Sequence, residues 1–318
     1  MNMRLFIAIL TLCFALPSVA QTFPSRPIRI IVPSTAGGAA DLLARLLAQH
    51  MATSLGQPVI VDNRPGAGNI IGTDAVAKAS PDGHTLLLAI NNHAINASLY
   101  KKLPYDPIKD FAAVSLLAST PHMLLVHPSL GIKSVTDFIA LARAQPGKLN
   151  YASAGNGSAS HLSAELVKEA FGIDWVHVPY RGSGPAMTDL MAGQVTMSVP
   201  GLSSTVSQVK SGALKALAVT GATRSPQLPN VPTLSEMKPG LVLETWVGIS
   251  APPKTPPQII AKLASLIEQA MKDPELQAQL FAQGVTPVYE KPSEITARMV
   301  REVGMFTALG KRTQISMD

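Results

Sequence analysis

Cysteine is almost absent from this chain of 318 residues, which contains a single one, Cys13. It lies inside an N-terminal segment with the features of an export signal, in which Arg4 supplies positive charge and residues 5–16 form a short apolar run. Small residues up to Ala20 offer a cleavage site. After cleavage near Ala20 the exported chain would contain no cysteine, which excludes disulfides, thiolate metal sites and cysteine nucleophiles.

Charged residues are also scarce, at 14% of the chain against about a quarter in typical soluble proteins. The formal net charge of +6 raises the question of a nucleic-acid partner. Adjacent basic residues occur only at Lys101-Lys102 and Lys311-Arg312, and no aromatic side chains are interleaved with them. The positive charge is therefore diffuse, and we predict no nucleic-acid partner, only a mild attraction for anions.

The length and the 47% hydrophobic content are sufficient for two domains, each with its own core. Short β-branched runs alternate with helical patterns along the chain, which indicates an α/β protein. We predict two domains, each with a doubly wound, mainly parallel sheet. The first domain comprises residues 24–122 and 223–318, and the second comprises residues 123–222.

A strand, a glycine-rich turn and a helix are predicted in succession between residues 148 and 171. Residues 149–152 form the strand, residues 154–157 form the turn, and Ser158 begins an amphipathic helix. The first turn of a helix has backbone N–H groups without partners and carries partial positive charge, so it favours anions. We predict that this turn binds a small carboxylate.

The same succession occurs at residues 28–54 and at residues 175–193. In the first of these, residues 34–38 form the glycine loop. Asp41 falls in the first turn of the following helix, and its carboxylate could have either a structural role there or a role in ligand binding. In the second, Arg181 could hold a carboxylate with two hydrogen bonds or point into solvent. Three units of strand, glycine-rich turn and helix, distributed over the two predicted domains, predict a cleft lined by helix N-termini.

A third parallel strand, Thr85–Ile90, is followed directly by Asn91 and Asn92. Ligands of doubly wound sheets lie outside the carboxyl ends of the strands, so these two side chains are expected to offer neutral hydrogen bonds to a ligand.

Two other functions were considered. Residues 66–72 have the spacing Gly-x-Gly-x-x-x-Gly, one residue longer than a dinucleotide fingerprint, and no acidic residue ends a following strand at the required distance. A serine hydrolase could use Ser158 and His161, but the Gly-x-Ser-x-Gly elbow is missing, and a histidine three residues along one helix cannot easily reach the serine. No His-Glu cluster has metal-ligand spacing. We therefore expect no enzyme activity, no cofactor and no metal.

Several longer runs point to a known family. They include PIRIIVPSTAGGAADLLARLLA, NYASAGNGSASHL, VPYRGSGPAMTDLMAGQV and LKALAVTGATRSPQLPNVPTLSE. With these runs, nearly the whole mature chain is similar to the Bug/TctC family of periplasmic solute-binding proteins, which is associated with tripartite tricarboxylate transporters. The resemblance implies a two-domain Venus-flytrap fold of type II that binds small carboxylates in the periplasm, largely through backbone N–H groups of the loops 34–38 and 153–158.

One departure from the family bears on the ligand. Members that bind amino acids often carry an acidic residue where this chain has Pro200, so a ligand without an amine is predicted. The predicted ligand-binding residues are Ser34, Thr35, Ala36, Gly37, Gly38, Asn91, Asn92, Ser153, Ala154, Gly155, Asn156, Ser158, His161, Arg181 and Pro200. We expect a monomer that delivers its ligand to inner-membrane transporter subunits, or one that signals to a membrane sensor, and the sequence does not separate these two outputs.

Overall fold

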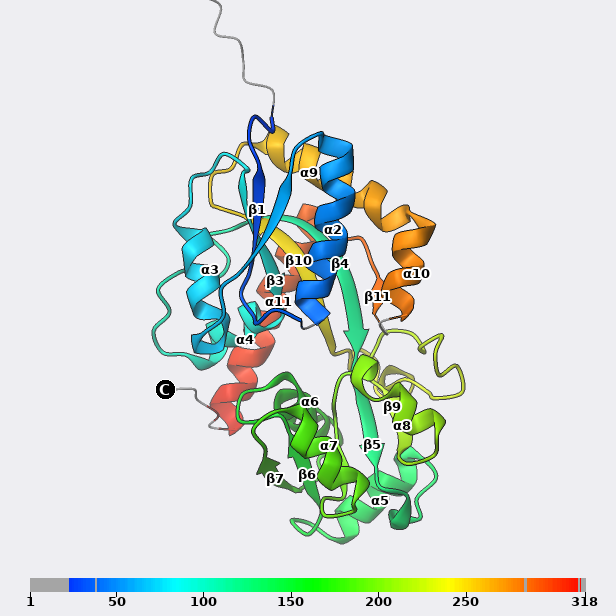
Figure 1. The fold of residues 1–318 in the computed structure, drawn as a ribbon. Coiled ribbons are helices and arrows are strands. Elements are labelled where there is room, and N and C mark those ends of the chain that lie inside the picture. The colour runs from blue at the N-terminus through cyan, green and yellow to red at the C-terminus, as the bar shows by residue number, and fades with distance from the viewer. Residues whose placement is uncertain (1–22, 38, 283–284, 314, 316–318) are drawn as a thin grey trace, which may run out of the picture.

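A computed structural model of the chain describes residues 23–37, 39–282, 285–313 and 315 (Figure 1). The structure contains two separate β-sheets with helices packed around them. The predicted export signal, its cleavage near Ala20 and the loop residue Gly38 lie outside the described residues.

The first sheet has six strands in the order β11-β4-β10-β3-β1-β2. The strands are β1 (Ile28–Val32), β2 (Val59–Asn63), β3 (Thr85–Ile90), β4 (Ala112–Pro121), β10 (Glu244–Ala251) and β11 (Thr286–Pro287). Strand β1 is parallel to β2 and β3, whereas β10 is antiparallel to both β3 and β4. Strands β1 to β4 therefore run in one direction, and β10 and β11 run against them.

The second sheet has five strands in the order β7-β6-β8-β5-β9. The strands are β5 (Met123–Val126), β6 (Asn150–Ser153), β7 (Val176–Pro179), β8 (Met197–Ser198) and β9 (Lys215–Val219). Strand β6 is parallel to β7 and β8, and β5 is antiparallel to β8 and β9. As in the first sheet, most strands run in one direction, and β5 is inserted antiparallel to both of its neighbours.

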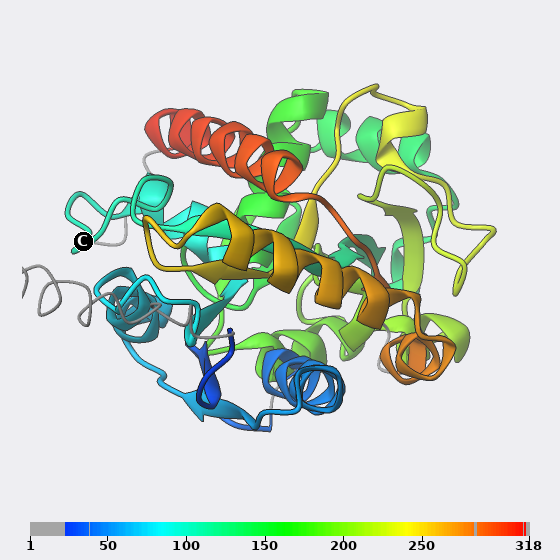
Figure 2. The same ribbon diagram turned by 90° about the horizontal axis from the view of Figure 1, so that it is seen from above.

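Helices cover both sheets. Those with the first sheet are α2 (Ala39–Leu55), α3 (Ile70–Ala77), α4 (Asn92–Leu99), α9 (Pro257–Lys272), α10 (Pro274–Ala282) and α11 (Pro292–Thr313). Those with the second are α5 (Val135–Ala144), α6 (Ala159–Phe171), α7 (Ser183–Met191) and α8 (Val206–Lys210). Short 3-10 turns are η1 (Ala67–Asn69), η2 (Pro128–Leu130), η3 (Leu202–Ser204) and η4 (Leu234–Glu236). Seen from above, α9 lies between α2 on one side and α11 on the other (Figure 2).

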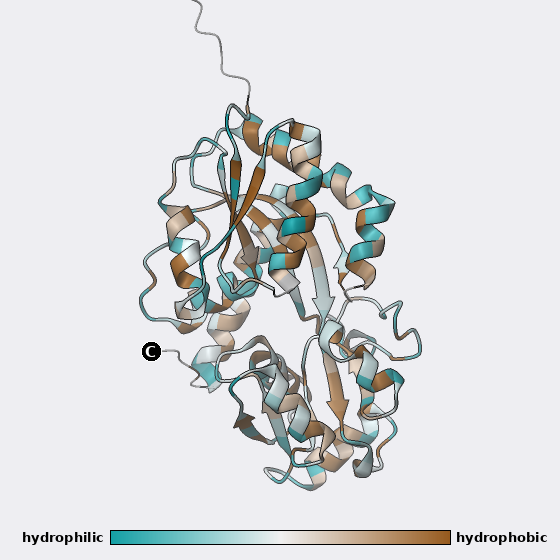
Figure 3. Cartoon of the chain, in the orientation of Figure 1, coloured by the Kyte–Doolittle hydropathy of each residue, from teal (hydrophilic) through white to brown (hydrophobic). Residues whose placement is uncertain are grey.

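The hydropathy pattern explains this arrangement. The strands are largely hydrophobic, and many of the helices carry hydrophobic and polar residues on different faces (Figure 3). In α9, Leu263, Ile267 and Ala270 recur at helical spacing and are buried against the first sheet and α2. Helix α6 is buried along most of its length, because it packs on its own sheet and also, through Leu162 and Leu166, in a cluster with residues of α11.

Most of the predicted strands and helices are confirmed by the structure. After β3, Asn92 begins α4, because the carbonyl of Asn91 accepts the N–H groups of Ala94 and Ile95 at 3.0 and 3.1 Å. Helix α7 begins at Ser183, two residues before Pro185. Pro185 still lies in the first turn, where no backbone N–H is needed.

The chain passes from the first sheet to the second between β4 and β5, at His122. It returns after β9, although Leu228 and Leu234 still pack in hydrophobic clusters of the second sheet. The domain limits at 122/123 and 222/223 stay a prediction. Within the part of the chain that the structure describes, no helix combines the length and the apolar character needed to cross a membrane.

Candidate functional site

The strand directions decide which loops meet. Because β1, β3 and β4 run in the same direction, their carboxyl ends lie at one edge of the first sheet. Ser34 and Asn91 follow β1 and β3 at this edge, and the chain leaves β4 from the same edge at Pro121. In Figure 1 the connection between β1 and α2 lies at the end of the first sheet that faces the second.

The second sheet presents the corresponding edge. Strands β6, β7 and β8 run together, and β5 runs against β8, so the amino end of β5 lies at their carboxyl edge. The N–H of Met123 donates to the carbonyl of Pro200 at 2.9 Å, and His122 pairs with Gly201. The carboxyl edges of the two sheets therefore face each other across His122.

In the loop after β1, Thr35, Ala36 and Gly37 are exposed and Ser34 is partly buried. The N–H of Gly37 donates to Oδ2 of Asp41 at 2.9 Å, and the carbonyl of Ser34 accepts from Nδ2 of Asn63 at 3.2 Å. The N–H of Gly37 is thus already used within the loop. Asp41 has a structural role here, because its buried carboxylate holds the loop against the first turn of α2.

The side chain of Asp41 also accepts a hydrogen bond from Nε of Arg45 at 3.1 Å. This bond is the main cause that holds the pKa of Asp41 below its ordinary value of 3.8, and the bond from the Gly37 N–H acts in the same direction against the effect of burial. Asp41 is therefore ionised at neutral pH and keeps the loop ordered.

Asn91 and Asn92 lie beside this loop, since β3 is the neighbour of β1. Asn91 is buried, its N–H donates to the carbonyl of Trp246 at 3.2 Å, and Asn92 is partly buried. His93, the next residue, bonds through Nε2 to the carbonyl of Pro107 at 2.8 Å, and burial lowers its pKa to about 4. His93 is a structural residue of the first domain.

The loop after β6 satisfies most of its own donors, contrary to the expectation of unpaired amides. The N–H of Ala154 donates to Oγ of Ser160 at 3.0 Å, and that of Gly155 donates to Oγ of Ser153 at 3.1 Å. The N–H of Gly157 donates to Nδ1 of His161 at 3.0 Å. For the N–H of Asn156, the described residues provide no partner, and this residue is exposed.

The loop after β7 lies alongside the loop after β6. The N–H of Tyr180 donates to the carbonyl of Ser153 at 3.0 Å, and the N–H of Gly182 donates to the carbonyl of Ala154 at 3.2 Å. Arg181 between them is exposed, and among the described residues its guanidinium has no partner. Pro200 is buried at the crossing between the sheets, where its carbonyl accepts the N–H of Met123.

Ser158 and His161 do not form the pair that a serine hydrolase needs. Oγ of Ser158 accepts the backbone N–H of His161 at 3.3 Å as the N-cap of α6. Nδ1 of His161 is occupied by the Gly157 N–H, and the described residues show no bond between the Ser158 hydroxyl and the His161 ring. Both residues thus order the start of α6.

Asn156 and His161 line a cavity of about 390 Å³ that lies between α6, β7 and the end of α11. Its other lining residues are Glu165, Lys168, Trp175, His177, Thr313 and Ile315. The loop after β1 contributes no residue to it. Glu165 and Lys168 were not among the predicted residues, although they follow His161 at helical spacing of four and seven residues and form one polar face of α6 with it.

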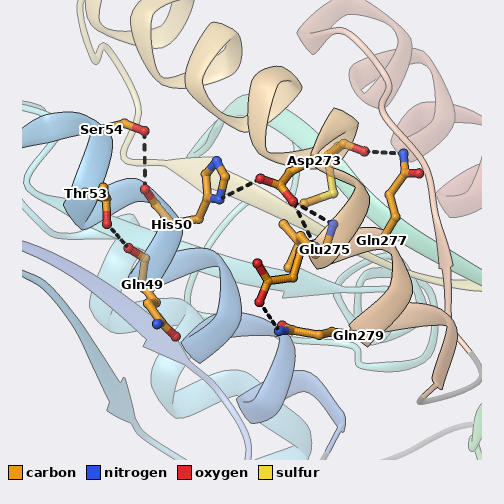
Figure 4. Close-up of polar contacts among 10 residues, drawn as sticks. Gln49, His50, Thr53, Ser54, Asp273, Glu275, Gln277 and Gln279 are labelled. Atoms are coloured by element: carbon orange, nitrogen blue, oxygen red, sulfur yellow. Dashed lines mark hydrogen bonds and ion pairs between the residues drawn. The ribbon is translucent and has the colours of Figure 1, made fainter.

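A second polar cavity, of about 210 Å³, lies between α2 and α10 (Figure 4). His50 and Asp273 meet there with Nδ1 and Oδ2 at 4.0 Å. These residues are near the carboxyl end of α2, away from the loop at its amino end. Across the described part of the chain, no group of three or more His, Cys, Asp or Glu side chains is arranged to hold a metal ion.

Comparison with known proteins identifies the family. Residues 43–305 match the tripartite tricarboxylate transporter family receptor, TctC. The chain belongs to this family of receptors. It is 37% identical to the protein BugT of Bordetella pertussis over 321 residues, with 98% of each chain covered.

Solved structures of similar proteins share the fold. Rpa4515 of R. palustris with adipate is 33% identical, with a TM-score of 0.77 over 92% of this chain and 99% of that one. MatC of Rhodopseudomonas palustris with bound malate is 32% identical, with a TM-score of 0.72 over 90% of this chain and 99% of that one. The predicted two-domain type II binding-protein fold is confirmed, and this receptor fold is that of solute-binding proteins.

Proposed function

We propose that this receptor captures a small carboxylate without an amine between its two domains and delivers it to membrane subunits of a tripartite tricarboxylate-type transporter. The facing carboxyl edges of the two sheets carry this proposal. Ligands of doubly wound sheets lie outside such edges, and here each edge presents a glycine-rich turn that precedes a helix. The adipate and malate in the two related structures are both dicarboxylates and support the ligand class.

The residues proposed to contact the ligand come from both edges. In the first domain they are Ser34 to Gly38, Asn91 and Asn92. In the second they are Ser153 to Asn156, Ser158, His161, Arg181 and Pro200, with the Asn156 N–H and the exposed Arg181 guanidinium as the available donors. Closure of the domains about the crossing at His122 would bury the ligand, as in other two-domain binding proteins.

The proposal includes the setting in which the receptor works. An export signal cleaved near Ala20 would release the chain into the periplasm, where it would act as a monomer. The domains would comprise residues 24–122 with 223–318, and residues 123–222. No cofactor is needed, because capture and release of a carboxylate require only hydrogen-bond donors and a change in domain orientation.

Thermal unfolding in the presence of single compounds tests the proposal. Malate, adipate and succinate should raise the melting temperature, since a ligand at one hundred times its Kd stabilises the folded protein by about 2.7 kcal/mol. Arg181→Gln should weaken binding of these acids, measured by isothermal titration. Arg224→Gln is the matched control, because that arginine is exposed and paired with Glu236. If no carboxylate raises the melting temperature, the proposal fails.

A further inference from the structure

The backbone amides of the turn after β6 differ in whether they have partners. Gly155 and Gly157 both have positive φ, +126° and +68°, which lets the backbone change direction on either side of Asn156. The N–H groups of the two glycines donate to side chains, whereas the N–H of Asn156 has no partner among the described residues. Burial differs in the same way, since Gly157 is buried and Asn156 is exposed. Two histidines, His161 and His177, account for this arrangement.

His161 holds the amide of Gly157. Its Nδ1 accepts the Gly157 N–H at 3.0 Å, and because a backbone amide can only donate, Nδ1 carries no proton. Burial is the main cause that lowers the pKa of His161 to about 4, and the neighbouring ring of His177 acts in the same direction. At neutral pH the imidazole is therefore uncharged, and Nδ1 stays available as the acceptor for Gly157.

His177 on β7 holds the amide of Gly155 by way of Ser153. Its Nε2 lies 2.6 Å from Oγ of Ser153, and the same Oγ accepts the Gly155 N–H at 3.1 Å. A hydroxyl has one proton and two lone pairs, so Oγ can accept from Gly155 whether His177 donates to it or accepts from it. The bond to His177 therefore orients the Ser153 hydroxyl, and this hydroxyl orients Gly155.

The two imidazoles are fixed by each other and by the core. Their rings stack at a centroid distance of 3.8 Å with an interplanar angle of 9°, and His177 also stacks on Tyr151 at 4.8 Å. Tyr151 is fully buried, and its hydroxyl donates to Glu165 at 2.7 Å. The positions of the two histidine rings are thus set by the core of the second domain, and the turn adapts to them.

We propose that His161 and His177 are positioning residues of the carboxylate-binding turn, which hold the amides of Gly155 and Gly157 and leave the Asn156 N–H as the turn's donor to the carboxylate. The ligand in this inference rests on the proposed function, whereas the action of the two histidines on the turn concerns the ligand-free protein. An amide that is already held in place loses less conformational entropy on binding than an amide of a free glycine-rich loop. Loss of either histidine should therefore weaken carboxylate binding.

Amide hydrogen exchange of the ligand-free protein, measured by NMR, tests the action of the histidines. In the wild type the amides of Gly155 and Gly157 should be protected at least tenfold more than that of Asn156. His161→Leu should lower the protection of Gly157 at least tenfold. His177→Phe, which keeps a ring for stacking, should lower the protection of Gly155 at least tenfold.

A conservative variant separates hydrogen bonding from packing. His161→Asn retains an acceptor close to the position of Nδ1, so the protection of Gly157 should return to within threefold of the wild type. His127→Leu is the matched control, because His127 follows the carboxyl end of β5, at the sheet edge opposite the turn, and both glycines should keep their protection. Circular dichroism checks the fold of each variant. Equal protection of Asn156 and the two glycines, or the same loss in His161→Asn as in His161→Leu, overturns the proposal.

Titration with malate, adipate and succinate tests the donor. The Asn156 amide signal should shift saturably with at least one acid. The Kd for this acid in isothermal titration should rise at least tenfold in His161→Leu and His177→Phe, return to within threefold in His161→Asn and stay unchanged in His127→Leu. Binding without a shift of Asn156, or with unchanged affinity in His161→Leu and His177→Phe, overturns this inference while the proposed function stands. If no acid binds, the proposed function fails together with the assigned donor, and hydrogen exchange still decides whether the histidines hold the turn.

Discussion

Nδ1 of His122 lies 2.9 Å from Oγ of Ser163, which joins the crossing between the two sheets to helix α6. The same Nδ1 lies 3.1 Å from the carbonyl of Val199, which can only accept, so Nδ1 carries the ring proton. Nε2 then accepts from the hydroxyl of Thr245 on β10 at 2.7 Å. One neutral imidazole therefore ties β10 of the first sheet to α6 and to the strand end before Pro200.

This network makes stability depend on pH. Burial lowers the pKa of His122 to about 4, below the ordinary value of 6.5 that it has in the unfolded chain. Between these two pKa values the unfolded chain binds more protons than the folded chain. The contribution of His122 to stability is therefore fully present above about pH 6.5 and is lost as the pH falls toward 4. In this pH range His122 changes the free energy of unfolding by on the order of 1 kcal/mol per pH unit.

Urea unfolding at pH 7, 6 and 5 should therefore show a decreasing free energy of unfolding in the wild type. His122→Gln should be less stable at pH 7 and should show a shallower decrease. His50→Gln serves as the control for loss of an imidazole, because the His50 side chain is 30% exposed and lies on the far end of α2. Equal slopes in the wild type and His122→Gln would show that His122 does not titrate in this way.

Asp41→Asn should loosen the loop after β1. The pKa of Asp41 is lowered chiefly by the hydrogen bond from Arg45, so the carboxylate stabilises the fold above pH 3.8, and this contribution is lost as pH falls through the lower folded value. At pH 7 the variant should lose about 1–3 kcal/mol, because its buried hydrogen bonds to Arg45 and the Gly37 N–H are weakened.

Acid unfolding followed by circular dichroism measures this effect, and the variant should depend less on pH below 3.8 than the wild type. Glu268→Gln is the control, since it removes a carboxylate from an exposed pair with Lys272 and should have a smaller effect. Under the proposed function, Asp41→Asn should also weaken carboxylate binding in titration calorimetry. A variant with wild-type stability at pH 7 would remove Asp41 from this structural role.

Gly155→Ala should destabilise the turn after β6. Gly155 has φ +126°, and an added Cβ would lie 3.1 Å from the carbonyl of Tyr180. Backbone strain of this kind costs about 1–3 kcal/mol, which should appear as a lower midpoint in urea unfolding. Gly184→Ala is the matched control, because that glycine lies in α7 without positive φ and with no neighbour within 4 Å. A lower midpoint for Gly184→Ala than for Gly155→Ala would contradict this account.

Leu162→Ala should weaken the contact of α6 with the first domain. Leu162 belongs to the second-sheet helix but is fully buried in a cluster with Trp246 and Phe306. Loss of its side chain should lower the free energy of unfolding by about 2–5 kcal/mol. Val300→Ala on α11 is 53% exposed and should stay within about 0.5 kcal/mol of the wild type in the same denaturation experiment. Equal losses in the two variants would mean that Leu162 does not hold the domains together.

Much of the architecture could be predicted because it depends on neighbouring residues. The β-branched run Ile28–Val32 and the glycine-rich turn before Ser158 have strong local preferences, and the structure shows a strand and an N-capped helix at these positions. The roles of Asp41 and Gly155 were harder to predict from the sequence, since each depends on where another side chain or carbonyl lies. Asp41 was left with two roles in the sequence analysis, and the bond to Gly37 decides for the structural one.

The sequence by itself determined the fold class, the order of strands and helices, and the family, because periodicity and glycine turns are properties of adjacent residues. Only the tertiary structure decided that most donors of the turn after β6 already have partners, and that Trp175 and Glu165 share a cavity with His161. Hydrogen-bond pairing and burial depend on segments distant in sequence, such as α6, β7 and the end of α11, and no local pattern specifies how these meet.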